Sequence, residues 1–147
     1  MFWISPHNQE HQREINKFYK QHKQNVSANN ADRVFVARME NSNNLIGVLI
    51  LRNYENESNH PIWLLRSVYI TPRMRRLGIA SEIIKEATSS LKTNVYTICD
   101  AELIRLYEGV GFLVTTEIPY ALTNLLNKKS LTLMVKLPFD SEQVEVF

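Results

Sequence analysis

The feature that most constrains the fold is an apolar run, residues 62–70, that stops at Thr71 and Pro72 and is soon followed by a helical pattern. Proline has no N–H group to donate to a neighbouring strand, so this run is expected to be a β-strand that ends there. An amphipathic helix is predicted from Gly78 onward, because apolar residues then recur on one helical face. That face carries Ile79, Ile83, Ile84, Ala87 and Leu91. The sequence therefore predicts a strand that turns directly into a helix.

The turn between this strand and this helix has the composition of an anion-binding site. Its pattern, P-x-x-R-x-x-G-x-A, is formed by Pro72, Arg75, Gly78 and Ala80. The first turn of a helix has N–H groups without intrahelical partners, and these groups and the helix dipole attract anions such as a pyrophosphate. Gly78 leaves room for phosphates to reach the backbone, and Arg75 and Arg76 can add charge-assisted hydrogen bonds.

The N-terminal part of the chain predicts a helix followed by two strands. Ser5 is expected to cap a helix that begins at Pro6. The buried stripe of this helix would hold Ile15, Phe18, Tyr19 and His22. Apolar runs at 34–37 and 45–51 predict two strands, and the Asn-rich residues 41–44 suit a hairpin turn between them.

The C-terminal part predicts three more strands and one more helix. The strands are expected at 95–99, 112–116 and 131–137, with an irregular link before the last one. Asp100 is predicted to cap a helix between the first two strands. This helix would bury Leu103, Leu106, Tyr107 and Val110 and end at Gly109 and Gly111.

These elements predict an α/β (α+β) fold with a mixed sheet and helices on both of its faces. The run 45–51 is apolar on both sides, which is typical of a strand covered on both faces. The succession of strand, helix and strand predicts a right-handed parallel unit. A chain of 147 residues suits one domain, 1–147, with one core.

Composition narrows the partners and the location that we expect. The formal charge of +2 is too small to indicate a nucleic-acid partner. Cys99 is the sole cysteine, and the N-terminus lacks the pattern of a secretory signal, so a cytoplasmic protein without disulfides is expected. No apolar stretch reaches the roughly 20 residues needed to span a bilayer. The four histidines lack metal-ligand spacing, and no metal is expected.

Two motifs give the chain a resemblance to the GCN5-related N-acetyltransferase (GNAT) superfamily. The segment Arg75-Arg76-Leu77-Gly78-Ile79-Ala80 resembles the coenzyme A signature R/Q-x-x-G-x-G/A, and residues 106–112 are similar to the segment Y-x-x-x-G-F. The resemblance implies the GNAT fold, whose mixed, mostly antiparallel sheet is splayed. It also implies transfer of an acetyl group from acetyl-CoA to a primary amine by direct attack in a ternary complex.

The resemblance also implies roles for particular residues. The coenzyme would be bound by Val68, Tyr69, Ile70, Arg75, Arg76, Leu77, Gly78, Ile79, Ala80 and Ser81. Backbone N–H groups near Val68 and Ile70 would polarise the thioester carbonyl. Tyr107 matches the family's tyrosine after the fifth strand, and it would be the general acid that protonates the leaving thiolate.

The general base is left open by the sequence. Family members often use a glutamate on the fourth strand, but residues 64–67 include no carboxylate. His60, Glu55 and Glu57 in the preceding loop, or a chain of water molecules, are the alternatives. Asp100 stands where many relatives have an asparagine that contacts the coenzyme, and it is expected to serve only as a helix cap. Cys99 is expected to be a core residue.

Several hypotheses about the acceptor and the function remain open. The acceptor would be a small-molecule amine, an amino acid or a peptide amine. Possible walls of its pocket are Trp3, Phe18, Tyr19, Tyr54, Trp63 and Tyr120. Acyl groups longer than acetyl and a homodimer are also possible. A non-catalytic acyl-CoA-binding or sensing module is the alternative function, and a nucleic-acid patch at Arg73, Arg75 and Arg76 is disfavoured because it lacks interleaved aromatic residues.

Overall fold

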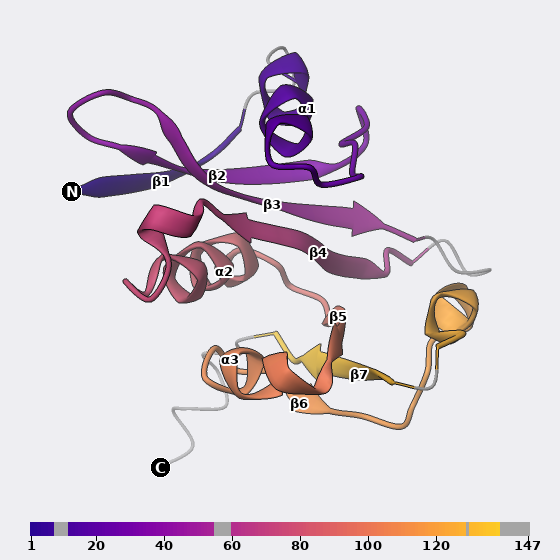
Figure 1. Cartoon of the computed structure of the whole chain (residues 1–147). Helices are drawn as coiled ribbons and strands as arrows, with labels where there is room; N and C mark the ends of the chain where they lie inside the picture. Colours follow the sequence, from indigo (N-terminus) through magenta and orange to yellow (C-terminus); the bar gives the residue numbers. More distant parts are fainter. Residues whose placement is uncertain (8–11, 55–59, 129, 139–147) are drawn as a thin grey trace.

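The computed structural model describes residues 1–7, 12–54, 60–128 and 130–138 (Figure 1). Seven strands form one sheet in the order β1-β2-β3-β4-β5-β7-β6. They are β1 (Phe2–Pro6), β2 (Arg33–Met39), β3 (Leu45–Asn53), β4 (Trp63–Ile70), β5 (Val95–Asp100), β6 (Leu113–Val114) and β7 (Leu131–Lys136). Among the described strands only β4 and β5 pair in parallel, so the predicted mixed sheet is confirmed.

Helices cover both faces of this sheet, as the sequence predicted. The α-helices are α1 (Gln12–Gln21), α2 (Ile79–Ser89) and α3 (Ile104–Glu108). The described residues also form the short 3-10 helices η2 (Pro72–Met74), η3 (Ala101–Leu103) and η4 (Tyr120–Leu126). No helix in the described ranges is long and apolar enough to cross a membrane.

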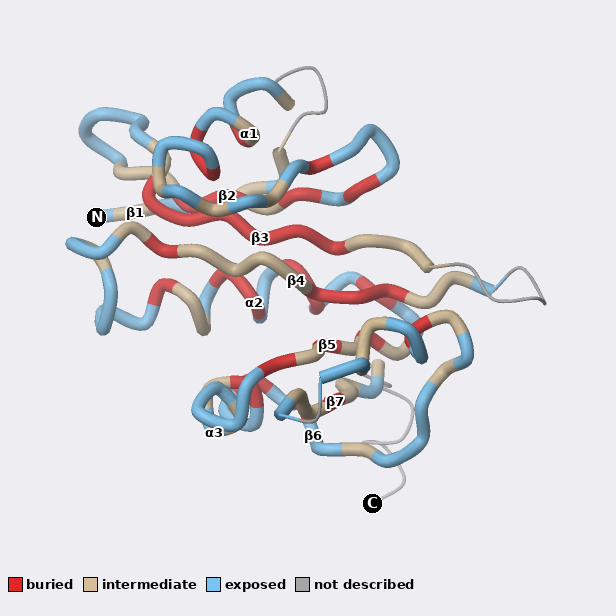
Figure 2. Tube along the Cα trace, turned by 45° about the vertical axis from the view of Figure 1, so that its right-hand side comes forward, coloured by how far each residue is buried: buried red, intermediate tan, exposed pale blue. Residues whose placement is uncertain are grey.

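The alternation of side chains along the strands separates the core into two layers. On one face, α2 and α3 pack on strand residues such as Leu49 and Leu65. On the other face, α1 packs on residues that include Ile50, and η4 packs on Leu64. The buried segments of β3 and α2 lie at the centre of the molecule (Figure 2). Side chains of β4 alternate between the two faces of the sheet, so β4 contributes residues to both layers.

The sheet splits between β4 and β5. The two strands pair only from Trp63 opposite Val95 to Leu65 opposite Thr97. Beyond this point the rest of β4 has no partner on that side among the described strands, and Figure 1 shows β4 and β5 diverging. The pairing of β4 with β3 is also irregular, with a register shift between Val48 and Ile50. The splayed sheet implied by the resemblance is therefore present.

The first predicted helix starts in the wrong place. Residues Phe2–Pro6 form β1, an edge strand that pairs with β2, and Ser5 and Pro6 do not begin a helix. A proline is tolerated here because one side of an edge strand has no ladder to complete. The described helix begins at Gln12, and the residues predicted as helix at 8–11 lie outside the described ranges. The predicted buried stripe is correct for Ile15, Phe18 and Tyr19. His22 lies just beyond the helix, with 4.7 Å between the centroids of its ring and the Phe18 ring.

Two details of the C-terminal part also differ from the prediction. The strand expected at 112–116 is paired only at Leu113–Val114, and the link after it contains η4. Asp100 precedes the 3-10 helix η3, but its side chain makes no capping hydrogen bond. Gly111 has φ 99°, which explains why a glycine ends this region.

Replacing Ile83 tests the packing of α2 on the sheet. Ile83 is fully buried, so Ile83→Ala should lower the free energy of unfolding by about 3 kcal/mol through lost burial and a residual cavity. Glu86→Ala, on the exposed side of the same helix, should change it by less than about 0.5 kcal/mol. Urea titrations of the three proteins measure the difference. Equal effects of the two substitutions would contradict the assigned helix face.

Candidate active site

The N-terminus of α2 presents free backbone donors. Gly78 caps the helix with φ 80° and ψ 7°, a left-handed conformation that glycine adopts readily. The first intrahelical bond runs from the Glu82 N–H to the Gly78 carbonyl at 3.1 Å, so the N–H groups of Ile79, Ala80 and Ser81 have no acceptor within the helix. A Cβ atom added at Gly78 would meet no atom within 4 Å. The space in front of these donors is therefore open to an anion.

The arginines before this helix are arranged around the end of β4. The Arg75 Nε donates a 2.9 Å hydrogen bond to the Ile70 carbonyl, and its guanidinium carbon lies 5.1 Å from the centre of the Tyr69 ring. These contacts fix the base of the Arg75 guanidinium and leave its other N–H groups available. Arg76 is exposed and adopts φ 66° in the tight turn. Two cations thus flank the free donors of α2.

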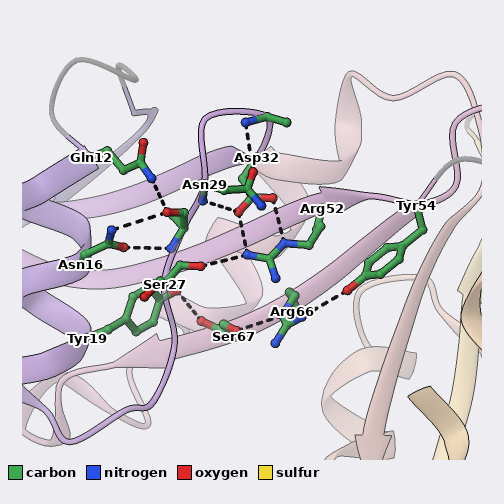
Figure 3. Close-up of polar contacts among 12 residues, drawn as sticks. Gln12, Asn16, Tyr19, Ser27, Asn29, Asp32, Arg52, Tyr54, Arg66 and Ser67 are labelled. Carbon is green, nitrogen blue, oxygen red and sulfur yellow. Dashed lines mark hydrogen bonds and ion pairs between the residues drawn. The ribbon is translucent and has the colours of Figure 1, made fainter. Parts of the chain in front are cut away.

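The irregularity in β4 turns backbone groups toward the split. Ser67 has φ 58°, an unusual value for a non-glycine residue inside a strand, and the Tyr19 hydroxyl donates a 2.6 Å hydrogen bond to its carbonyl (Figure 3). After the irregularity, the Thr71 N–H donates to the Ile46 carbonyl of β3 at 2.8 Å. Because N–H groups alternate along a strand, those of Ile70 and Val68 point away from β3. They face the side on which β5 has diverged.

A cavity of about 360 Å³ lies where the end of β4 meets α2 and α3, and we call it the α2 cavity. It is lined by Val68, Tyr69, Ile70, Met74, Arg75, Arg76, Gly78, Ile79, Ala80, Ser81, Leu103, Leu106 and Tyr107. The structure thus brings together every residue predicted to bind the coenzyme except Leu77, which is 58% exposed and outside this lining. Met74, Leu103 and Leu106 were missed because apolar wall residues have no distinctive sequence pattern.

A second cavity, of about 350 Å³, follows the split itself, and we call it the β4–β5 cavity. It is lined by Leu64, Leu65, Arg66, Ser67, Val68, Thr97, Ile98, Cys99, Leu103, Tyr107 and Leu125. The two cavities share Val68, Leu103 and Tyr107. A group held in the α2 cavity is therefore beside a group held in the β4–β5 cavity at these three residues.

Tyr107 stands at this junction with its side chain buried to 5% exposure. Burial raises the pKa of Tyr107 above its usual value, and the neighbouring Thr97 hydroxyl offsets part of this increase. The Thr97 hydroxyl donates its proton to the Leu65 carbonyl at 2.9 Å, which fixes the position of Thr97. The Tyr107 phenol is therefore protonated at neutral pH, and its ring packs edge-to-face on Phe112 with 5.5 Å between the ring centroids.

Arg66 is the charged residue in the described lining of the β4–β5 cavity. Its Nη1 donates a 3.2 Å hydrogen bond to the Tyr54 hydroxyl, and its Nε lies 3.4 Å from the Ser67 hydroxyl oxygen, as Figure 3 shows. A charged residue within the apolar run 62–70 is the sequence signal that could have identified it. Thr97, within the apolar strand β5, offers a similar but weaker signal.

None of the candidate general bases is in the described lining of the two cavities. His60 is exposed and outside the described lining of both cavities, while Glu55 and Glu57 lie outside the described residues. Within the described lining no side chain is a carboxylate or an imidazole. Cys99 is a core residue as expected, with burial raising the pKa of its thiol, although it also lines the β4–β5 cavity.

The aromatic residues predicted as walls of an acceptor pocket do not line either cavity. Phe18 and Tyr19 belong to α1 and pack in the core between this helix and the sheet, and Trp63 is buried in the layer of α2. Trp3 lies on the edge strand β1, and Tyr120 is 83% exposed. Tyr54 is connected to the β4–β5 cavity indirectly, because its hydroxyl accepts a hydrogen bond from Arg66, which lines that cavity. Aromatic composition alone could not distinguish core positions from a pocket.

No cluster of metal-ligating side chains occurs in the described part of the chain.

Comparison with known proteins identifies the family. The sequence profile of the Acetyltransferase (GNAT) family matches residues 1–112, and the chain belongs to this family. A search of curated proteins found no match. The resemblance inferred from the two motifs is therefore confirmed at the level of the family.

Solved structures share the fold at low sequence identity. The structure of NAA60 from Arabidopsis thaliana in complex with a bisubstrate analogue has a TM-score of 0.66 and 15% identity, over 96% of this chain and 100% of that chain. A GNAT acetyltransferase from Streptococcus pneumoniae has a TM-score of 0.68 and 14% identity, over 95% and 100%. A chimera of spermidine N-acetyltransferase from Vibrio cholerae and hSSAT has a TM-score of 0.59 and 18% identity, over 92% and 95%. At these identities the likeness shows the fold alone.

The backbone conformation at Gly78 is open to a direct test. An alanine there would meet open space, so the cost of Gly78→Ala should come from the left-handed backbone alone, about 1 kcal/mol of unfolding free energy. The matched control is Gly109→Ala, where φ is −64° and the expected change is within about 0.5 kcal/mol. Thermal unfolding of both variants measures the difference. A neutral Gly78→Ala would contradict the assigned turn.

Proposed function

We propose that the chain is an acetyl-CoA-dependent N-acetyltransferase that transfers an acetyl group to a primary amine by direct attack in a ternary complex. One observation carries the proposal: the α2 cavity and the β4–β5 cavity meet at Val68, Leu103 and Tyr107. Two reactants held in adjoining cavities can react without a covalent enzyme intermediate, because their reacting atoms are held close together. The acceptor is a small-molecule amine, an amino acid or a peptide amine.

The residues of the α2 cavity suit acetyl-CoA. The unpaired N–H groups of Ile79, Ala80 and Ser81 would donate hydrogen bonds to the pyrophosphate, with Arg75 and Arg76 as cationic partners. Acetyl-CoA would supply an acyl group activated as a thioester. The N–H groups of Val68 and Ile70 would then donate to the carbonyl oxygen of that thioester, where negative charge develops. Such donors typically contribute about 3 kcal/mol to lowering the barrier.

Tyr107 is proposed as the general acid for the leaving thiolate. It is buried at the junction of the cavities and, since its pKa is raised, it retains its proton at neutral pH. A proton is then available where the sulfur would leave. The packing of its ring on Phe112 fixes the position of the phenol and supports this role.

The acceptor amine is proposed to lose its proton to water. An alkylamine with a pKa of about 10.4 is almost fully protonated at pH 7, and only the neutral form can attack. The described lining of both cavities has no carboxylate or histidine to take that proton. Transfer of this proton to water fits such a lining. The rate then depends on the fraction of the amine that is neutral.

Binding and turnover of acetyl-CoA test the proposal. Calorimetry should detect acetyl-CoA binding to the chain, and a thiol-release assay should detect turnover with at least one amine. Gly78→Glu should weaken acetyl-CoA binding by about 100-fold or more, because a carboxylate would fill the space in front of the free N–H groups and repel phosphate. Ser89→Glu, exposed near the other end of α2, is the control and should bind normally. Equal affinity of all three proteins would contradict the proposed site.

Replacing Tyr107 tests the proton donor. Tyr107→Phe should lower kcat by about 100-fold, whereas Tyr96→Phe, on β5 but outside both linings, should not. An acid loses activity as the pH rises through its pKa. Because the pKa of Tyr107 is raised, kcat/KM should increase from pH 6 to pH 9 with the neutral fraction of the amine and decline only above about pH 10. A descending limb below pH 9 that Tyr107→Phe abolishes would contradict the raised pKa.

A non-catalytic acyl-CoA-binding module is the second candidate, favoured by the absence of a carboxylate from the described cavity lining. It predicts acetyl-CoA binding that Gly78→Glu abolishes, without thiol release on any amine. The two assays above therefore distinguish the candidates.

A further inference from the structure

We propose that Arg66 binds an anionic group of the acceptor, so that the preferred acceptor is an amine that also carries a carboxylate. The inference rests on the proposed transferase function and narrows the class of its acceptor. It follows from the position of Arg66, from the partners of its guanidinium and from the other residues of the β4–β5 cavity.

Arg66 lies on the acceptor side of the split. It is opposite Ile50 in the register of β3 and β4, and Ile50 packs under α1. Arg66 therefore faces the layer of α1 and η4, away from the layer of α2 and α3 that contains the proposed coenzyme site. It lines the β4–β5 cavity but not the α2 cavity. A ligand that contacts Arg66 is thus beside the coenzyme rather than in its place.

The charge of Arg66 has no carboxylate partner among the described residues. Figure 3 shows the contrast with Arg52, the penultimate residue of β3, which lies on the same face. The Arg52 Nε and Nη2 donate to the two carboxylate oxygens of Asp32 at 2.9 and 2.8 Å. Among the described residues, the Arg66 guanidinium instead contacts neutral oxygens, the hydroxyls of Tyr54 and Ser67 at 3.2 and 3.4 Å.

These contacts leave part of the Arg66 guanidinium available to a ligand. A guanidinium has five N–H donors, and the two hydroxyl contacts use one on Nε and one on Nη1. The Tyr54 hydroxyl accepts from Arg66 and still has its own proton to donate. A planar fork of donors matches a carboxylate better than an uncharged group. Arg66 is half-buried, so water screens such a contact only in part.

The rest of the β4–β5 cavity supports the same class of acceptor. Its other described residues are apolar or neutral, and a guanidinium beside a bound amine disfavours a second positive charge. A polyamine, with several cations, would meet one more cation and no described anion. An amine with its own carboxylate would pair that group with Arg66 and direct its neutral end toward Tyr107.

A panel of matched acceptors tests the proposal. Each pair compares an aminocarboxylate with its amide, for example β-alanine with β-alaninamide and L-phenylalanine with L-phenylalaninamide, and spermidine and 2-aminoethylphosphonate complete the panel. For at least one pair, kcat/KM of the acid, calculated per neutral amine, should exceed that of the amide by about 10- to 100-fold, the usual effect of a charge-assisted hydrogen bond. A higher kcat/KM for 2-aminoethylphosphonate than for every carboxylate would indicate that Arg66 binds a phosphate-like group, and this result would overturn the proposal. A higher kcat/KM for spermidine or for the amides would also overturn it.

Variants then assign the preference to Arg66. Arg66→Gln should reduce the ratio of acid to amide toward one, mainly through KM of the acid, and Arg66→Lys should restore only part of it because the fork is lost. Arg13→Gln, an exposed arginine of α1, is the matched control and should keep the full ratio. If Arg66 only supported the fold, Arg66→Gln would lower acid and amide rates equally, and that result would overturn the proposal.

A binding measurement separates this inference from the proposed function. The aminocarboxylate and the amide of each pair are titrated calorimetrically into the protein saturated with coenzyme A, which needs no turnover. Binding of at least one acid, with loss of that binding in Arg66→Gln but not in Arg13→Gln, supports the inference even if thiol release is never seen. Turnover of amines with equal binding of acids and amides supports the transferase function and overturns the role of Arg66.

Discussion

The parallel pairing of β4 with β5 ends after Leu65 and Thr97, and the positions of both cavities depend on that break. A continuous ladder would have closed the sheet and paired the N–H groups of Val68 and Ile70 with β5. The break is stabilised on each side of the sheet. Tyr19 donates to the carbonyl of the left-handed Ser67, and Thr97 donates to the Leu65 carbonyl. The site is therefore a consequence of backbone groups that the sheet leaves without partners.

The same break gives the two faces of the sheet different chemistry. The α2 side offers open N–H groups and the cations Arg75 and Arg76, which suit the phosphates of a coenzyme. The α1 side offers Arg66, whose hydroxyl partners leave its charge uncompensated among the described residues. Tyr107 stands where the two cavities meet. In this account, the coenzyme and the acceptor approach from opposite faces, and each is recognised largely by its negative charge.

The sequence predicted those parts of the fold that are encoded by local patterns. The strand before Pro72 and the helix after Gly78 were correct because proline, glycine and a helical apolar stripe act over a few residues. The strand β1 was missed because Ser5 and Pro6 also suit a helix start, and only pairing with β2 decides between them. Apart from Val68 and Tyr107, the lining of the β4–β5 cavity was not predicted, since the tertiary fold brings residues such as Arg66 and Leu125 to one cavity and no local pattern encodes this. The motif residues of the coenzyme site were found by their spacing, and their roles stay predictions.

The most direct test is a crystal structure of the chain with acetyl-CoA. We expect the pyrophosphate to accept hydrogen bonds from the backbone of residues 78–81, the thioester carbonyl to face the Val68 or Ile70 N–H, and the sulfur to lie within hydrogen-bonding distance of the Tyr107 hydroxyl. A coenzyme bound elsewhere, or a thioester that does not enter the split between β4 and β5, would show that this break in the sheet is not the active site.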